Sequence, residues 1–264
     1  MNRWIVLFLL AASAGCNDAE GPDVDNANVS TQPTTAPGTR PADVDDILDA
    51  MEAAGREHTQ IAADVRYHVH QRMTGDSELR TGRVKYQRHT ETTPARFHIR
   101  FDTLKLGEGP ILNDKVEYGF DGRWVTVAKH RIKQMTRYEV AAEGENIDAF
   151  KLGKGPFPLP FGQEAAVMRE YFTVTTRPTR PSDPPGTHYL LLIPREQHRE
   201  SLSFTRLEMW IDRQRSLPVK IISRDKNRNV TTVTFADIRT DVKFSRKNFR
   251  LPRKIGWEYN EQRN

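Results

Sequence analysis

Residues 61–70 read IAADVRYHVH, and this stretch decides the class of fold. Every second side chain is apolar, from Ile61 through Val65 to Val69, whereas most of the side chains between them are polar or charged. Successive side chains of a β-strand point to opposite faces of a sheet, so a period of two predicts a long strand. One face of this strand would be apolar and the other polar, as is common in antiparallel sheets.

The same alternation recurs along the rest of the chain. We expect further strands around Val84 and Tyr86 and over residues 95–101, 116–120, 124–128, 132–140, 188–193, 204–211, 219–224 and 230–238. Gly82 indicates a β-bulge, while Asp121-Gly122 and residues 226–229 indicate tight turns. About ten strands with short connections predict an antiparallel meander. The period alone leaves a β-sandwich open, but the length of several strands favours one large curved sheet.

A helix is expected before the first strand. Its apolar residues recur three and four positions apart, which is typical of a helix with one buried stripe. They are Val44, Ile47, Leu48, Met51 and Ala54. Asp43 or Thr39 can cap the first turn, and we expect the helix to end at Gly55.

Residues 151–162 break the strand pattern with the sequence KLGKGPFPLPFG. Three prolines at alternate positions exclude a central strand, yet the segment is strongly apolar. A short helix is expected over residues 163–172. Together the two suit a lid over one open side of the sheet, formed by Phe157, Leu159, Phe161, Val167 and Met168. The alternative is a plain crossover that packs on the core.

The N-terminus has the pattern of an export signal. Residues 1–15 begin with Arg3, continue with the apolar run WIVLFLLAA and end in small residues. The only cysteine, Cys16, follows directly and resembles the lipidated cysteine of a bacterial lipobox, although Ser13 replaces the usual leucine. An ordinary cleaved signal is the alternative. Residues 16–41 are rich in proline and poor in bulky apolar side chains, which indicates a disordered tether before a single domain over residues 42–264.

Composition and charge narrow the classes of function. A single cysteine excludes an internal disulfide framework, and the only continuous apolar segment is too short to span a bilayer. The net charge of +5 averages over unlike parts. Residues 17–46 hold seven acidic side chains and one arginine, so with Arg3 set aside residues 47–264 carry a net charge of +10. After export, anionic lipid headgroups or envelope polymers are better partners for this charge than nucleic acid. A merely solvated basic surface is the alternative.

Several short motifs together resemble the bacterial outer-membrane lipoprotein carrier and receptor superfamily, the Lol-type proteins. They are the helix before a long alternating strand, Pro94–Ile99 (PARFHI), Val116–Trp124 (VEYGFDGRW), Met209–Asp212 (MWID), Leu217–Val219 (LPV), Thr231–Phe235 (TTVTF) and Phe249–Pro252 (FRLP). They span residues 43–252. The proline-rich lid segment and the tether depart from the pattern, so the chain need not be a carrier in the strict sense.

The resemblance implies a mainly β (α+β) fold. We expect an unclosed antiparallel half-barrel of about ten to eleven strands whose concave face is apolar and covered by the N-terminal helix and the lid. It also implies a cavity for acyl chains of a lipid or lipoprotein, lined by Val65, Tyr67, Val69, Val84, Tyr86, Phe97, Ile99, Phe101 and Trp124. The protein would be a monomer without cofactor, anchored through Cys16 in the cell envelope and facing the periplasm, with Asn17 favouring the outer membrane.

Two other functions remain open at this point. The same fold could serve a structural or regulatory lipoprotein that binds a protein or an anionic envelope polymer, with the cavity filled by its own side chains. A metal-dependent hydrolase around His68, His70 and His98 is the third hypothesis, although these residues also suit the polar face of a one-sided sheet. The sequence contains none of the common hydrolase or phosphate-loop motifs, so we expect no enzyme activity.

Overall fold

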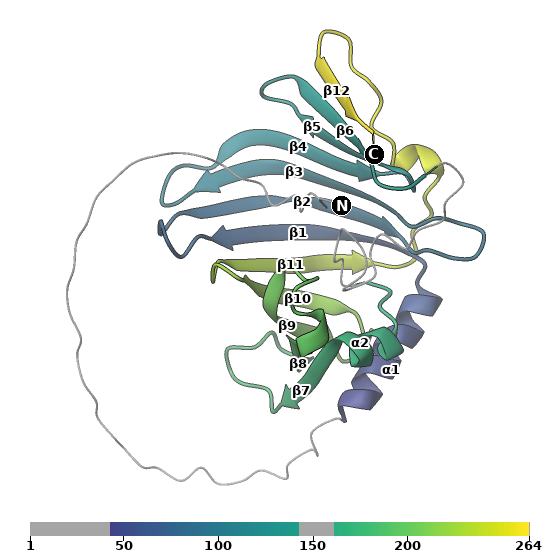
Figure 1. Cartoon of the computed structure of the whole chain (residues 1–264), viewed down its shortest axis with the longest axis vertical. Coiled ribbons are helices and arrows are strands. Elements are labelled where there is room, and N and C mark those ends of the chain that lie inside the picture. The colour runs from purple at the N-terminus through teal and green to yellow at the C-terminus, as the bar shows by residue number, and fades with distance from the viewer. Residues whose placement is uncertain (1–42, 143–160, 264) are drawn as a thin grey trace, which may run out of the picture. The chain divides into compact units, whose positions relative to one another are not determined.

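The computed structural model describes residues 43–142 and 161–263 of the chain. The fold is mainly β, with one large sheet and two helices, α1 (Val44–Glu57) and α2 (Ala165–Tyr171) (Figure 1). The strands are β1 Gln60–His70, β2 Ser77–Gln87, β3 Arg96–Leu106, β4 Leu112–Phe120, β5 Trp124–Lys129, β6 Gln134–Glu139, β7 Phe172–Arg177, β8 Thr187–Pro194, β9 Phe204–Asp212, β10 Pro218–Asp225, β11 Val230–Arg239 and β12 Glu258–Gln262. Single turns of 3-10 helix lie at Glu196–His198 and Arg246–Asn248.

The strand order is β12-β6-β5-β4-β3-β2-β1-β11-β10-β9-β8-β7. Two antiparallel meanders, β1 to β6 and β7 to β11, therefore join where β1 pairs with β11. β12 and β7 are the two edges, so the sheet does not close on itself. The expected half-barrel with an N-terminal helix and a lid helix is confirmed.

The strand count differs from the expected ten to eleven, because the described residues form twelve strands in one sheet. β7 follows α2 without a break, and its first residue, Phe172, is the last residue of the helix that the sequence predicts over residues 163–172. β12 reads EYNEQ, which has no apolar alternation, and it pairs with β6 in parallel rather than antiparallel. β12 therefore departs from the expected antiparallel order.

The register of the strands gives the sheet two distinct faces. Ile61 on β1, Tyr86 on β2 and Phe97 on β3 lie side by side, and Phe120 on β4 continues this row. The same face crosses the other half of the sheet through the row Tyr67, Val233, Ile221, Met209 and Leu190. We call it the apolar face and the opposite one the outer face.

α1 begins where the sequence predicts, because the side chain of Asp43 accepts a hydrogen bond of 3.2 Å from the backbone N–H of Asp45. The sequence predicts that the helix ends at Gly55, but it continues to Glu57. Gly55 serves a different purpose. A Cβ on this residue would lie 2.8 Å from the Cα of Gly162, so only glycine lets α1 approach the segment before α2.

The two helices cover the apolar face next to β7. α1 and α2 pack against each other and against β7, and Arg169 on α2 pairs with Asp45 and Asp49 on α1. The large side chains of this half are almost completely buried, as Leu190, Leu192, Met168, Met209 and Phe172 show. Each such side chain contributes about 1.5–3 kcal/mol relative to an exposed one, so this half of the face is a filled core.

The outer face is not polar throughout. Residues 244–254 run along it, and Phe249 is almost fully buried there. A Cβ on Gly119 of β4 would lie 2.9 Å from the carbonyl oxygen of Phe249, so the two backbones are in contact. The motif at 249–252 lies in this crossing segment and not in a strand. In the part of the chain that the structure describes, no helix is long and apolar enough to cross a membrane.

Candidate functional site

The predicted cavity residues fall into three groups. Five of them are buried on the apolar face: Val65, Val84, Tyr86, Phe97 and Phe101. Three others on the same face are half-buried: Tyr67, Val69 and Ile99.

The prediction that Trp124 lines the cavity on the apolar face is wrong. It pairs with Glu139, while its neighbour Val125 lies opposite Phe120 on the apolar face. The short turn between β4 and β5 sets this parity, so the indole lies on the outer face, where it packs under the guanidinium of Arg137 at 4.2 Å.

The lid contacts the sheet through Phe161. Its ring lies 5.8 Å from the ring of Tyr86 and 4.9 Å from that of Phe235, measured between centroids. The hydroxyl of Tyr86 donates a hydrogen bond of 3.2 Å to the backbone carbonyl of Phe161. Val167 and Met168 on α2 are buried as well. The other lid residues, Phe157 and Leu159, and the lipidation residue Cys16 lie outside the described residues.

Part of the apolar face remains accessible. Its half-buried side chains are Tyr67, Val69, Ile99, Tyr118 and Val233, which we call the apolar patch. Tyr67 pairs with Val233, and Ile99 pairs with Tyr118. The patch thus draws its residues from four strands, β11, β1, β3 and β4, with β2 lying between β1 and β3.

A β-bulge in the centre of the patch makes room between its two sides. Gly82 lies opposite Phe101, and a Cβ on Gly82 would overlap the backbone of Arg100 at 1.8 Å. Because β2 carries no side chain at this position, the ring of Tyr67 on β1 reaches that of Phe101 on β3, with centroids 5.9 Å apart. Phe101 in turn meets Tyr118 edge-on at 6.2 Å. The predicted bulge is confirmed, and it joins the aromatic side chains into one surface.

Both tyrosines of the patch are neutral at physiological pH. Burial, followed by the charge of Glu78, raises the pKa of Tyr67 to about 12. Burial likewise raises the pKa of Tyr118 well above its ordinary value. The buried Tyr118 hydroxyl has no hydrogen-bond partner among the described residues.

A buried ion-pair network lies beside the patch on β2, where Arg80 pairs with Tyr67 and Glu78 pairs with Val69. Nε of Arg80 donates to Glu78 over 2.5 Å, and Nη1 of Arg80 donates to Asp114 over 3.1 Å. Arg80 and Asp114 are almost completely buried. These residues are not among the predicted site residues, although the sequence contains a signal for them. Glu78 and Arg80 share the parity of Val84 and Tyr86 on β2, which places charges on an otherwise apolar face.

The histidines do not form the hypothetical metal site. His68 pairs with Leu79 on β2, whereas His98 on β3 pairs with Lys85 and donates a hydrogen bond of 3.0 Å to Glu117. His68 and His98 thus lie six residues apart along β2. The described residues contain no group of three or more His, Cys, Asp or Glu that could hold a metal ion.

Comparisons with known proteins give similar folds but no family. No family model and no curated protein matches the chain. A solved structure of an uncharacterized conserved protein from Thermus thermophilus is similar at 12% identity and a TM-score of 0.46, covering 82% of this chain and 98% of that one. LprF from Mycobacterium bovis is similar at 11% identity and a TM-score of 0.44, covering 76% and 95%. A LolA superfamily protein from Nitrosomonas europaea is similar at 12% identity and a TM-score of 0.34, covering 78% and 96%.

The similar structures therefore include the superfamily whose fold the sequence resembles. Each of these similarities concerns only the path of the backbone. The function proposed below is argued from the residues of this chain itself.

Proposed function

We propose that this chain is a membrane-anchored envelope lipoprotein that binds an acyl chain of a lipid or lipoprotein on its apolar patch. The observation that carries the proposal is the accessibility of Tyr67, Ile99 and Tyr118 on a face whose other half is a filled core. Apolar surface left accessible in this way marks a binding site more often than chance exposure does. The chain would act in the localisation or sensing of such ligands.

The chemistry of the patch suits an acyl chain. Its side chains are aliphatic or aromatic and both tyrosines are neutral, while the adjacent charges of Glu78 and Arg80 are already paired with each other. Each methylene removed from water contributes about 0.8 kcal/mol, which holds an alkyl chain without specific polar contacts.

The membrane anchor is a separate part of the proposal. A diacylglyceryl group on Cys16 and a tether over residues 16–41 would hold the domain near a membrane facing the periplasm, with the outer membrane favoured. Mass spectrometry of the intact chain purified from a membrane fraction should show the added diacylglyceryl mass. A Cys16→Ser chain should lack this mass and leave the membrane fraction. An unmodified Cys16 in the membrane fraction would contradict this part.

The experiment on binding uses the full-length chain with Cys16→Ser, titrated with a fluorescent fatty-acid probe. Ile99→Asp places a charge in the patch at a half-buried position, so the fold should tolerate it. We expect the probe to bind at least tenfold more weakly to this variant. Ile132→Asp is the matched control, because Ile132 is exposed in the turn between β5 and β6. Equal binding by both variants, or no binding by the parent chain, would contradict the proposal.

A protein-binding lipoprotein is the second candidate, favoured by the filled half of the apolar face. Leu190, Leu192 and Met209 leave no accessible apolar surface there. If the whole face were filled in the same way, the fold would act as a structural or regulatory scaffold. The probe titration separates the two candidates, since a scaffold of this kind would not bind a fatty acid.

A further inference from the structure

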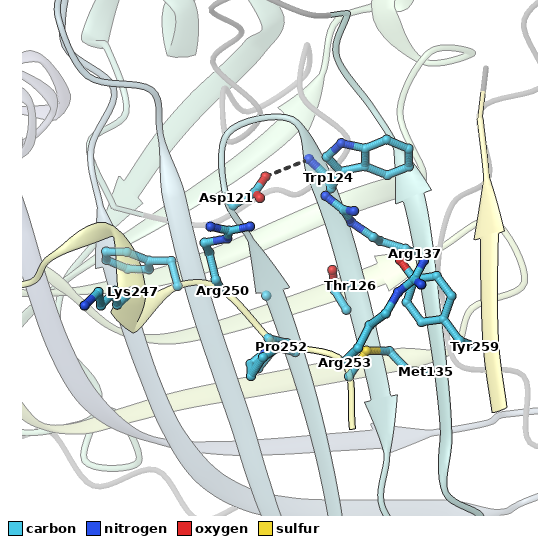
Figure 2. Close-up of a pocket in the computed structure, with 13 residues that line it drawn as sticks. Asp121, Trp124, Thr126, Met135, Arg137, Lys247, Arg250, Pro252, Arg253 and Tyr259 are labelled. Atoms are coloured by element: carbon cyan, nitrogen blue, oxygen red, sulfur yellow. Dashed lines mark hydrogen bonds between the residues drawn. The ribbon is translucent and has the colours of Figure 1, made fainter. Parts of the chain in front are cut away.

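Two adjoining cavities lie on the outer face, away from the apolar patch. The larger has a volume of about 520 Å³ and the smaller about 300 Å³. The larger lies between β4–β6, β12 and the crossing segment 247–254 (Figure 2). The smaller lies between β2–β6 and the same segment, and both are lined by Met135, Lys247 and Arg250. They therefore form one groove, which we call the basic groove.

The groove concentrates positive charge. Its six cationic side chains are Lys85, Arg137, Lys247, Arg250, Arg253 and Lys254, whereas its acidic side chains are Asp121 and Glu117. Both carboxylates are already engaged. Asp121 accepts hydrogen bonds of 3.2 and 3.0 Å from the backbone N–H groups of Arg123 and Trp124. Glu117 accepts from the side chains of both His98 and His130, over 3.0 and 2.7 Å.

Three of the cations, Lys85, Lys247 and Arg250, have no acidic partner among the described residues. In the described parts of the chain, no carboxylate lies within ion-pair distance of Lys247 or Arg250, and both side chains are exposed. The positive potential extends to β3, where burial and the nearby Arg246 lower the pKa of Arg96. Like charges brought together in this way store repulsion that a bound anion relieves.

Two other guanidinium groups are held in place by aromatic rings. Arg137 lies over Trp124 at 4.2 Å, and Arg253 lies over Tyr259 at 3.5 Å. Figure 2 shows the guanidinium groups of Arg137, Arg250 and Arg253 around Thr126 on the floor of the larger cavity. Stacking fixes the plane of a guanidinium, so little side-chain entropy is lost on binding. Glu261 lies 3.7 Å from Arg137 and 3.9 Å from Arg253, so one carboxylate offsets part of the charge of these two groups.

We propose that the basic groove binds a phosphate group, either of a small soluble phosphate compound or of a lipid headgroup. Guanidinium forks bind phosphate oxygens in pairs, and Lys247 adds a point charge. The Thr126 hydroxyl can donate a further hydrogen bond from the floor. The groove lies on the face opposite the apolar patch, so the site is independent of acyl binding.

The test titrates the full-length Cys16→Ser chain with inorganic phosphate and follows the NMR signals of the Trp124 indole N–H and the Thr126 amide. We expect saturable shifts that equal ionic strengths of chloride do not produce. The double variant Lys247→Gln/Arg250→Gln should bind at least tenfold more weakly, and because both side chains are exposed the fold should remain intact. The control Arg72→Gln/Arg224→Gln removes the same charge from exposed positions outside the groove and should bind as the parent does. Shifts that never saturate, or that persist in the groove variant, would overturn the proposal.

Vesicles distinguish the two sources of phosphate. The same chains are sedimented with vesicles of phosphatidylglycerol and, separately, of phosphatidylcholine in low salt. If the ligand is an anionic headgroup, binding to phosphatidylglycerol is lost in the groove variant and kept in the control variant. If it is a soluble compound, the NMR shifts depend on the groove but the vesicle binding does not. Loss of neither signal in the groove variant overturns the proposal for both sources.

Discussion

The hydroxyl of Tyr86 on β2 donates a hydrogen bond of 3.2 Å to the backbone carbonyl oxygen of Phe161. This bond and the buried ring of Phe161 fix the start of the lid to the apolar face. Tyr86→Phe removes the donor and leaves a buried carbonyl with one partner fewer. We expect the free energy of unfolding to fall by about 1 kcal/mol, measured by urea denaturation. An unchanged midpoint and slope would show that the bond does not stabilise the folded chain.

Gly55→Ala should destabilise the protein although alanine favours a helix. The new Cβ would lie 2.8 Å from the Cα of Gly162, and backbone atoms cannot yield as a flexible side chain can. We expect a loss of about 1–3 kcal/mol, as for overpacking in a core. Ala53→Gly, on the exposed side of α1, is the control for helix propensity alone. Glycine is about 1 kcal/mol less favourable than alanine in a helix, so this variant measures the gain that Gly55→Ala would show without the close contact. A Gly55→Ala chain as stable as the parent would mean that α1 and the lid segment are not in close contact.

Stability should fall as the pH is lowered from 7.5 to 5. Burial lowers the pKa of His68, His130 and His188 below the ordinary 6.5. Below pH 6.5 these histidines are therefore protonated to a greater extent in the unfolded chain than in the folded chain. The free energy of unfolding decreases as the pH falls, until the pH is below the folded-state pKa values. Urea denaturation at pH 7.5, 6.0 and 5.0 measures this slope. His188→Gln should reduce the slope, while a flat or rising profile would contradict the assignment.

Carboxylates add to the loss at lower pH. Burial raises the pKa of Glu117, but hydrogen bonds from His98, Lys115 and His130 outweigh it and hold this pKa well below its usual range. The stabilisation by this cluster is present above pH 4.5 and is lost as the pH falls further.

The crossing segment on the outer face should stabilise the whole domain. Phe249→Ala removes an almost completely buried ring, which meets the ring of Phe244 edge-on at 5.6 Å, so we expect a loss of about 3–5 kcal/mol. Phe244→Ala is the matched variant, because Phe244 is only half-buried in the same segment and should cost less. Thermal unfolding followed by circular dichroism compares the two. Equal and small losses would mean that the segment is only loosely attached.

The sequence predicts what depends on local patterns. The alternation in Ile61–Val69, the bulge at Gly82 and the turn at Asp121-Gly122 all have local causes, and the structure contains each of them. These features suffice to predict an antiparallel sheet of long strands with one apolar face, whereas the open half-barrel is implied by the resemblance to the Lol-type proteins. They also place Val65, Tyr86 and Phe97 on that face correctly.

What the sequence does not predict depends on distant partners. Gly55 reads as a helix stop, since its contact Gly162 lies more than one hundred residues away. Trp124 reads as a cavity residue, since a period of two holds within a strand but is reset by each turn. Tyr118 and Val233 belong to the site because their side chains stay accessible, whereas the core side chains are buried. This difference arises only when the strands are assembled, so the sequence does not predict it.

Native mass spectrometry of the full-length Cys16→Ser chain, exposed to membrane lipid extract and then repurified, tests acyl binding most directly. Our account predicts a species with one bound acyl lipid, which the Ile99→Asp chain loses and the Ile132→Asp chain keeps. A folded chain that stays free of lipid, or a bound lipid that Ile99→Asp leaves in place, would contradict the claim that the apolar patch is an acyl-binding site.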